Sequence, residues 1–345
     1  MGDSMVRVIA EMSGNHNGSF ETALEIVRAV AQSGAHYLKL QTYTADTITL
    51  PVKGGFFDVS ANHELWGSRN LYELYTEAHT PWEWHQEIFQ TARDLGIIPF
   101  STPFDESAVD FLEGLNVGLY KIASLEIVDI PLIKYVASTQ KPLIISTGTA
   151  TIGEIEEAVT AARQSGCKDL TLMLCTSAYP AVASDAHLAR LEILRDLFEV
   201  KVGISDHSKG IYVSLAAVAL GATLIERHVT LNREAGGIDS NFSLNPLELN
   251  ELVNASKEVE QSIGNEFSWR KSSEAESLRH RPSIHVTQKV FKGEKVSLKN
   301  VNTLRPSGGL EPKNLELVLG KFFTQDAEMG TPMSWALISE TPPEN

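Results

Sequence analysis

Two segments of the sequence each contain a histidine two positions after another polar residue, a spacing that can build a metal site. In "TLIERHVTL", Glu226 and His228 stand two residues apart, and in "VKVGISDHS" Ser205 and His207 do the same. Residues i and i+2 of a strand share a face, and neighbouring strands lie roughly 4.8 Å apart. The pattern predicts that His207 and His228 hold a divalent transition metal with Glu226 nearby, while Arg227 faces the other side. Two core histidines bonded to backbone carbonyls are the alternative.

Two lysines also interrupt apolar, strand-like runs. Lys39 stands in "YLKLQTY" and Lys121 in "LYKIASL". A lysine in such a strand must pair with an anion, or lose its proton and act as a nucleophile. The first choice suits an enzyme that binds a phosphorylated substrate, and the second a metal-independent aldolase that forms a Schiff base. Glu11 ends the first apolar run and is a candidate general acid or base; His16, in the loop that follows, either positions substrate or braces the loop.

The elements that must position these residues alternate between short apolar runs and longer helical periods. Eight such alternations in roughly 265 residues predict an α/β protein with a (β/α)8 TIM barrel, whose typical size is about 250 residues. A doubly wound open sheet is the alternative, but no Gly-x-Gly-x-x-Gly follows the first run. The predicted strands are residues 6–14, 36–43, 96–104, 119–126, 141–148, 169–178, 200–208 and 222–230.

Polar groups follow every predicted strand. Active sites of such barrels lie at the C-terminal strand ends and draw on several strands. Two lysines and a series of hydroxyls at one mouth suit a phosphate and a carboxylate. The polar ends are Glu11, Lys39 with Gln41, Ser101 with Thr102, Lys121 with Ser124, Ser146 with Thr147, Thr176 with Ser177, Ser205 with His207, and Glu226 with His228.

Composition limits the possible partners. The 345 residues include 44 acidic and 29 basic ones, a formal net charge of −15. Nucleic acid and anionic membranes both require a basic surface, so neither is expected as a partner. The two cysteines, Cys167 and Cys175, lack metal-ligand spacing and predict a reduced, cytoplasmic protein. No segment reaches 18 apolar residues, so no membrane span is predicted.

Changes in composition divide the chain. We predict a (β/α)8 barrel over residues 1–265, a polar linker over 266–283, and a small β-rich module over 284–345, where short alternating runs are separated by turns. A module of about 60 residues has a thin core, so it is expected to dock against another surface. Segment 45–80 is an oversized loop for a barrel, and loops of such length are usually functional or disordered.

Taken together, these motifs resemble the sialic acid synthase family, the phosphoenolpyruvate-dependent nonulosonic acid synthases. The resemblance covers nearly the whole chain, through "IAEMSGNHNGS", "AHYLKLQTY", "FSTPFD", "YKIASLE", "PLIISTGTATIGEI", "GISDHSKG", "GATLIERHVTL" and "GIDSNFSLNP". The C-terminal "VFKGEKVSLKNVNTLRPSGGLEP" resembles the antifreeze-like (SAF) domain of that family. Among the branches of the family, the segments "LYELYTEAHTPWEWH" and "KLQTYTADTITL" resemble the pseudaminic acid synthase branch. "CTSAYP" has Ser177 where the N-acetylneuraminate branch usually has asparagine, and the legionaminic acid branch stays open.

The resemblance implies a role for each matching residue. It implies a divalent metal on two histidines, commonly Mn²⁺, with Mg²⁺ or Co²⁺ also possible. It implies a domain-swapped homodimer in which an arginine of one antifreeze-like domain enters the partner's barrel. The implied residues are His207 and His228 for the metal; Lys39, Thr102, Lys121, Ser124, Ser146, Ser177 and Ser205 for phosphoenolpyruvate; Glu11 as the catalytic glutamate; Glu226, Tyr179 and Asp239 around the metal and sugar; and Arg305 as the inserted arginine.

The implied reaction condenses phosphoenolpyruvate, 2,4-diacetamido-2,4,6-trideoxy-altrose and water to pseudaminic acid and phosphate, with C–O cleavage and a metal as Lewis acid. N,N'-diacetyllegionaminic acid and N-acetylneuraminic acid synthases are the alternatives within the family. A Schiff-base lysine aldolase and a non-catalytic sugar-binding scaffold are the alternatives outside it.

Overall fold

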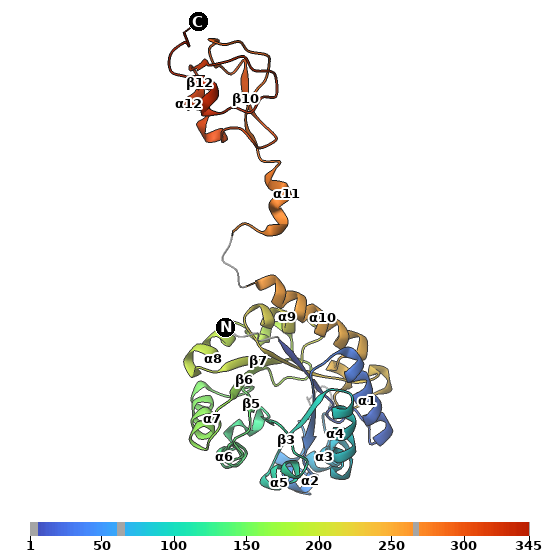
Figure 1. The fold of residues 1–345 in the computed structure, drawn as a ribbon. Coiled ribbons are helices and arrows are strands. Elements are labelled where there is room, and N and C mark those ends of the chain that lie inside the picture. The colour runs from blue at the N-terminus through green and yellow to red at the C-terminus, as the bar shows by residue number, and fades with distance from the viewer. Residues whose placement is uncertain (1–5, 61–65, 265–268, 345) are drawn as a thin grey trace. The chain divides into compact units, whose positions relative to one another are not determined.

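Eight parallel strands close into a barrel in which each strand pairs with the next and β8 pairs with β1 (Figure 1). The computed structural model describes residues 6–60, 66–264 and 269–344. Its contacts divide it into two units, residues 1–264 and 265–345, each described here by itself. The strands are β1 (Arg7–Glu11), β2 (Tyr37–Thr42), β3 (Ile98–Pro103), β4 (Tyr120–Ile122), β5 (Leu143–Ser146), β6 (Leu170–Cys175), β7 (Lys201–Ser205) and β8 (Leu224–His228). The predicted barrel is confirmed, and every strand is shorter than expected.

Apolar side chains plug the inside of the barrel below its C-terminal end. A parallel strand alternates its side chains between the barrel interior and the helices. The interior apolar layer is separate from the larger core between strands and helices. Gly203 belongs to this packing, since an added Cβ would lie 2.7 Å from the carbonyl oxygen of Leu224 on the next strand. The apolar layer consists of Ile9, Tyr37, Phe100, Ile144 and Met173, with Leu119 and Leu224 packed against it.

A ring of helices surrounds the strands (Figure 1). Helix α1 illustrates why they form where they do: Ser19 caps it by accepting from the Thr22 amide, and Gly34 ends it with φ of 80°. Helix α10 begins with a capping box between Asn245 and Glu248. The helices around the barrel are α1 (Phe20–Ser33), α4 (His85–Asp94), α5 (Glu106–Gly114), α6 (Ile130–Ser138), α7 (Ile152–Gln164), α8 (Arg190–Phe198), α9 (Tyr212–Ala219) and α10 (Pro246–Ile263).

The long connection between β2 and α4 is partly helical. It contains α2 (Ala45–Ile48), a 3-10 turn at Gly55–Phe57 and α3 (Leu71–Ala78). Asn70 holds it together, since its side-chain amide donates to the carbonyl oxygens of Val52 and Phe57. The predicted oversized loop is therefore an ordered insertion over its described residues, and residues 61–65 lie outside them.

The second unit is small and built from short strands. Its buried core includes Val286, Val301 and Phe323. The predicted linker contains a short helix, α11 (Ala275–Leu278), and the Arg279 carbonyl accepts from the Ser307 amide, so the end of that segment is held within the unit. An antifreeze-like fold for this unit stays a prediction. Its strands are β9 (Ser283–Val286) paired with β10 (Val301–Leu304) and β11 (Phe322–Phe323) paired with β12 (Ile338–Ser339), with α12 (Leu315–Val318) between them.

None of the helices in the described ranges combines the length and the apolar character needed to cross a membrane.

Candidate active site at the barrel mouth

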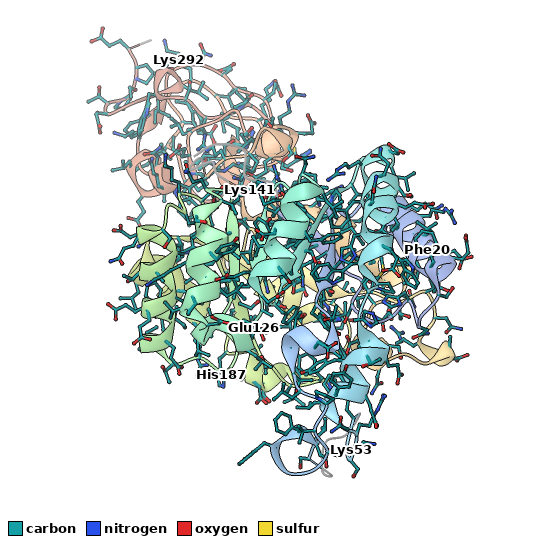
Figure 2. All side chains as sticks on the ribbon, turned by 90° about the horizontal axis from the view of Figure 1, so that it is seen from below. Phe20, Lys53, Glu126, Lys141, His187 and Lys292 are labelled. Carbon is teal, nitrogen blue, oxygen red and sulfur yellow. The ribbon has the colours of Figure 1, made fainter. Side chains whose placement is uncertain are left out.

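The polar side chains inside the barrel form one layer at the C-terminal ends of the strands. Figure 2 shows Lys53, Glu126 and His187, which follow β2, β4 and β6, toward one end of the barrel, and Lys141, which precedes β5, toward the other. On β1, β2, β3 and β5 the polar residue stands two positions after a residue of the apolar layer, as Glu11 does after Ile9. The two side chains therefore both point into the barrel. The layer consists of Glu11, Lys39, Thr102, Lys121, Ser146, Ser205 and Glu226, all buried.

Lys39 lies at the centre of this layer. Its ammonium forms an ion pair with Glu11, donates to the Thr102 hydroxyl at 3.1 Å and lies 3.8 Å from Glu226. Glu11 is held in turn by the Ser13 amide, which donates to Oε1 at 2.8 Å. Four strands, β1, β2, β3 and β8, thus contribute to one buried network, as the positions of these residues at strand ends predict.

Lys121 forms the second half of the layer. It donates to the Ser146 hydroxyl at 2.6 Å and lies 3.9 Å from Glu226. Glu226 also accepts from the Ser205 hydroxyl at 3.0 Å. Glu226 is therefore shared between two lysines, and its second oxygen, Oε2, is buried without a hydrogen bond among the described residues.

Burial and mutual charge set the protonation of this layer. Burial raises the pKa of Glu11 to about 7, although Lys39 opposes the shift. Burial also acts against the charge on Lys39, but Glu11 and Glu226 outweigh it and raise the pKa of Lys39. Burial lowers the pKa of Lys121, and Glu226, 3.9 Å away, acts against this shift. Because an uncompensated buried cation is costly, an arriving anion would gain most at Lys121.

The two histidines lie side by side above this layer. Their ring centroids are 5.3 Å apart. His207 Nδ1 lies 3.1 Å from the Thr176 carbonyl oxygen, which can only accept, so Nδ1 carries a proton and Nε2 of the neutral ring keeps its lone pair. His228 Nδ1 is buried and has no hydrogen-bond partner in the described part of the chain, and it lies 3.5 Å from Asp239 Oδ2. Burial, with His207 and the lysines, lowers the pKa of His228 well below its ordinary value.

These imidazoles fit a divalent transition metal, but the expected carboxylate is not grouped with them. Among the residues that the structure describes, no three His, Cys, Asp or Glu side chains are arranged as a metal site. Glu226, predicted to lie near the metal, is bound instead by Lys39 and Ser205 because ammonium and hydroxyl donors are closer to it. The two imidazoles, in their neutral forms, would supply the protein's share and leave other positions to water or substrate.

Hydroxyls converge on the backbone at Gly148, just beyond β5. The Ser124 hydroxyl accepts from the Gly148 amide at 3.2 Å. A Cβ added to Gly148 would lie 2.3 Å from Ser177 Oγ and 2.7 Å from Ser124 Oγ. Ser177 Oγ is also 4.0 Å from the Cys175 sulfur, at the end of β6. Ser124 and Ser177 are thus brought together beside a residue without a side chain, and their hydroxyls are a suitable surface for an anion.

Aromatic rings from three loops cover the histidines. Tyr179 lies 4.5 Å from the His207 ring and 5.7 Å from the Trp66 ring between centroids. Trp66 also donates through Nε1 to the Ile238 carbonyl at 3.0 Å. Phe242 lies 5.0 Å from the His228 ring. The loops after β2, β6 and β8 therefore meet over the imidazole pair.

Sequence patterns missed several of these contacts. The Ser13 hydroxyl donates to Asp239, which joins the first loop to the last, and burial raises the pKa of Asp239. Ser13 stands two residues after Glu11, the same spacing that drew attention to His207 and His228, and could have been found by it. Phe242 had no such signal, since its role depends on a loop fold.

Three residues from the sequence analysis lie away from the layer. His16 braces its loop, because Nδ1 accepts from the Gly18 amide at 3.1 Å and the ring packs edge-on against Trp84. Ser101 points toward the helices, with its hydroxyl 2.6 Å from that of Thr42. Arg305 is exposed in the second unit, directly after β10, and its entry into a partner's barrel stays a prediction.

Comparisons with known proteins agree with this architecture. The family model described as "NeuB family" matches residues 26–268. A pseudaminic acid synthase of Helicobacter pylori is 40% identical over 329 residues, which are 95% of this chain and 96% of that protein. An N,N'-diacetyllegionaminic acid synthase of Campylobacter jejuni is 35% identical over 92% of this chain and 96% of its own length. The crystal structure of an N-acetylneuraminic acid synthetase from Leptospira borgpetersenii, 32% identical, superposes with a TM-score of 0.70 and covers 79% of this chain and 90% of that one.

These relatives are named synthases or synthetases, and the matches cover at least 79% of this chain. The chain therefore belongs to the NeuB family, and it is an enzyme.

Proposed function

We propose that this enzyme condenses phosphoenolpyruvate with an open-chain 2,4-diacetamido-2,4,6-trideoxy-altrose and water to give pseudaminic acid and phosphate. The observation that carries the chemistry is the buried pair Lys39 and Lys121, each bonded to a hydroxyl inside a closed barrel mouth. The pair suits a substrate with two anionic groups. The identity of 40% to a pseudaminic acid synthase supports this sugar, and the legionaminic acid synthase at 35% marks the alternative.

The lysines and hydroxyls bind phosphoenolpyruvate in this proposal. Lys121 gains a counter-ion, which restores its charge, while Ser146 positions the ammonium. The Ser124 and Ser177 hydroxyls hold a second set of oxygens at the same mouth, and the Gly148 amide orients the first of them. Glu226 keeps both lysines on the inner face and so sets where the anion lies.

The chemistry forms one carbon–carbon bond and breaks one carbon–oxygen bond. C3 of phosphoenolpyruvate attacks the sugar aldehyde, whose oxygen takes a proton. Water adds to C2, and the bond between C2 and the bridging oxygen then breaks. That oxygen leaves with phosphorus as inorganic phosphate, and the 2-keto acid remains. Glu11, which forms an ion pair with Lys39, serves as acid or base either at opening of the sugar ring or at the addition of water.

His207 and His228 would hold a divalent metal, with Mn²⁺ proposed. When bound, the metal supplies Lewis-acid polarisation of a substrate oxygen. Tyr179 and Phe242 cover the imidazoles and keep bulk water from them. Removal of divalent ions with EDTA should abolish phosphate release, and Mn²⁺ should restore it; full activity after exhaustive chelation would refute the metal requirement.

The decisive assay is phosphate release from phosphoenolpyruvate with Mn²⁺ and each of three sugars. The 2,4-diacetamido-altrose sugar should support turnover, whereas its mannose-configured analogue and N-acetylmannosamine should not. Preference for either mannose-configured sugar would move the enzyme to another branch of the family. Phosphoenolpyruvate labelled with ¹⁸O in the C–O–P bridge should yield labelled phosphate, and unlabelled phosphate would refute C–O cleavage.

A Schiff-base aldolase is the second candidate, because burial lowers the pKa of Lys121 and a neutral amine is the nucleophile such an enzyme needs. Borohydride in the presence of substrate would then attach substrate carbon to Lys121. We expect no such adduct in intact-mass spectra, since Lys121 has Ser146 and Glu226 to hold it as a cation.

We also propose a domain-swapped homodimer in which Arg305 acts on the partner's barrel, and a cytoplasmic location. The exposure of Arg305 after β10 leaves its guanidinium available for such a role. Replacing Arg305 with alanine should raise the KM for the sugar far more than it weakens the dimer, as measured by kinetics beside analytical ultracentrifugation. An unchanged sugar KM would refute this role.

A further inference from the structure

Arg227 is the largest of the side chains with no more than 2% exposure, and it points away from the polar layer. It stands on β8 between Glu226 and His228, so its side chain faces the surrounding helices. Its guanidinium donates to Asp206 Oδ2 at 2.7 Å, to the Gly210 carbonyl at 2.7 Å and to the Ser208 carbonyl at 2.6 Å. All three partners belong to the loop after β7.

These bonds enclose His207. Asp206 precedes it and Ser208 follows it, so the chain is tied to one guanidinium on both sides of the histidine. Asp206 is itself fixed, because Oδ1 accepts from the Ser208 amide at 2.9 Å and Oδ2 from the Ser214 hydroxyl at 2.6 Å on α9. The loop therefore cannot move relative to the guanidinium without breaking several buried hydrogen bonds.

His228 is attached to the same guanidinium through one peptide bond, since it follows Arg227 on β8. The two imidazoles are thus connected through the peptide bond between His228 and Arg227 and through the hydrogen bonds of Arg227 to Asp206 and Ser208, on each side of His207. Their ring centroids are 5.3 Å apart. The strand pairing between β7 and β8 ends at Ser205 with Glu226, followed by one backbone hydrogen bond from the Asp206 amide to the Glu226 carbonyl, so both histidines lie beyond the last paired residues of these two strands.

A buried ion pair is a costly way to fill this space. The outer face of a barrel strand normally packs apolar side chains, and exchange of a buried ion pair for well-packed apolar residues is often neutral or stabilising. The pair instead gives the loop one specific position relative to β8. Groups that orient metal ligands from outside the site typically change metal affinity by about 10- to 100-fold when replaced.

We propose that the Arg227–Asp206 pair is a positioning element that sets the separation and orientation of His207 and His228 for a divalent metal. This inference rests on the metal site of the proposed function. Arg227 touches neither substrate nor metal; it acts only through the loop.

The test measures Mn²⁺ binding to the metal-free protein, by calorimetry and by the loss of the free-ion EPR signal, without substrate. Arg227→Met should bind Mn²⁺ at least about tenfold more weakly than the wild type. Arg227→Lys should rescue part of the affinity, because an ammonium can pair with Asp206 but cannot hold both carbonyls at once. Asp206→Asn, which keeps the shape of the side chain, gives a second, milder perturbation.

The matched control is Arg163→Met. Arg163 lies in the last turn of α7 and donates to the backbone carbonyls of Phe198 and Glu199, away from the imidazoles. We expect this variant to lose thermal stability with an unchanged Mn²⁺ affinity. A role for Arg227 in stability alone would give the same result for both arginines.

The outcomes separate the two proposals. If the wild type binds no divalent metal, the proposed metal site fails and this inference fails with it. If the wild type binds Mn²⁺, and folded Arg227→Lys and Asp206→Asn proteins bind it equally well, the metal site stands and the positioning inference is overturned. A graded loss from Asp206→Asn and Arg227→Lys to Arg227→Met, with Arg163→Met unchanged, supports it.

Discussion

Replacement of Gly148 with alanine tests whether the hydroxyls beyond β5 line the substrate site. The new Cβ would lie 2.3 Å from Ser177 Oγ, and ordinary contact begins at 3.4 Å, so this hydroxyl must retreat by 3.4 − 2.3 = 1.1 Å. Ser124 Oγ, at 2.7 Å, must retreat by 3.4 − 2.7 = 0.7 Å. The φ of Gly148 is not in the left-handed region, so alanine brings no backbone strain of its own.

The cost should fall on binding rather than on folding. The two nearest obstructing atoms are ends of rotatable side chains, so the free enzyme can turn them away, but a bound anion requires them in place. Ser124 Cβ, at 3.1 Å, must also shift by a few tenths of an ångström, which adds a small cost in the free enzyme. Overpacking of this kind costs about 1–3 kcal/mol. At about 1.4 kcal/mol for each factor of ten, the KM for phosphoenolpyruvate should rise about 5- to 140-fold.

The assay is steady-state phosphate release with each substrate varied in turn, beside thermal unfolding of the free protein. Gly153→Ala is the matched control, because no atom lies within 4 Å of its added Cβ in α7. It should leave both KM values unchanged and stabilise the helix by up to about 1 kcal/mol. An unchanged KM for phosphoenolpyruvate in Gly148→Ala would mean that Ser124 and Ser177 do not contact the substrate, and the reasoning would be refuted.

Three further predictions follow from other parts of the barrel. Burial lowers the pKa of His16 and His85 to about 4, so the unfolded chain, with its ordinary value of 6.5, binds more protons between these pH values. The free energy of unfolding should fall by roughly 3 kcal/mol for each ring as pH drops from 6.5 to 4. Urea titrations of His85→Gln should show a smaller fall of the unfolding free energy with pH than the wild type, and an equal fall would contradict a role of His85 in it. Lys121→Met should raise the KM for phosphoenolpyruvate at least about tenfold with little change in the sugar KM, since a charged hydrogen bond contributes about 1.5–3 kcal/mol; a selective effect on the sugar would place the anion elsewhere. In the same kinetic assay, Trp66→Ala should raise the KM for the sugar with little change in the KM for phosphoenolpyruvate, because Trp66 packs on Tyr179 over the histidines. Equal effects on both KM values would contradict a contact of Trp66 and Tyr179 with the sugar.

The barrel and most of the polar layer were predictable because a two-residue period leaves a direct trace in the sequence. Lys39 and Lys121 interrupt apolar runs, and the only inexpensive place for a charge in such a strand is a site with partners. The outward direction of Arg227 followed from the same period.

Contacts set by loop folds were not predictable. The period shows that Glu226 points inward, but it does not show that Lys39 and Lys121 lie closer to it than the histidines do. The approach of Trp66 to Tyr179 depends on how an insertion folds across the mouth, and no local pattern encodes a contact between residues more than a hundred positions apart. The helix in the predicted linker was missed because its four residues are too few to show a helical period.

The polar layer has a consequence for evolution. Lys39, Lys121, Glu11 and Glu226 are each no more than 4% exposed, and joint replacement of such a buried charge network by well-packed apolar residues is often neutral or stabilising, although loss of one member alone is not. The barrel thus keeps a reserve of stability that selection for turnover prevents it from using. A chain of this fold released from catalysis should lose these charges early and melt at a higher temperature, so an apolar mouth in a related barrel would mark an enzyme that has ceased to work.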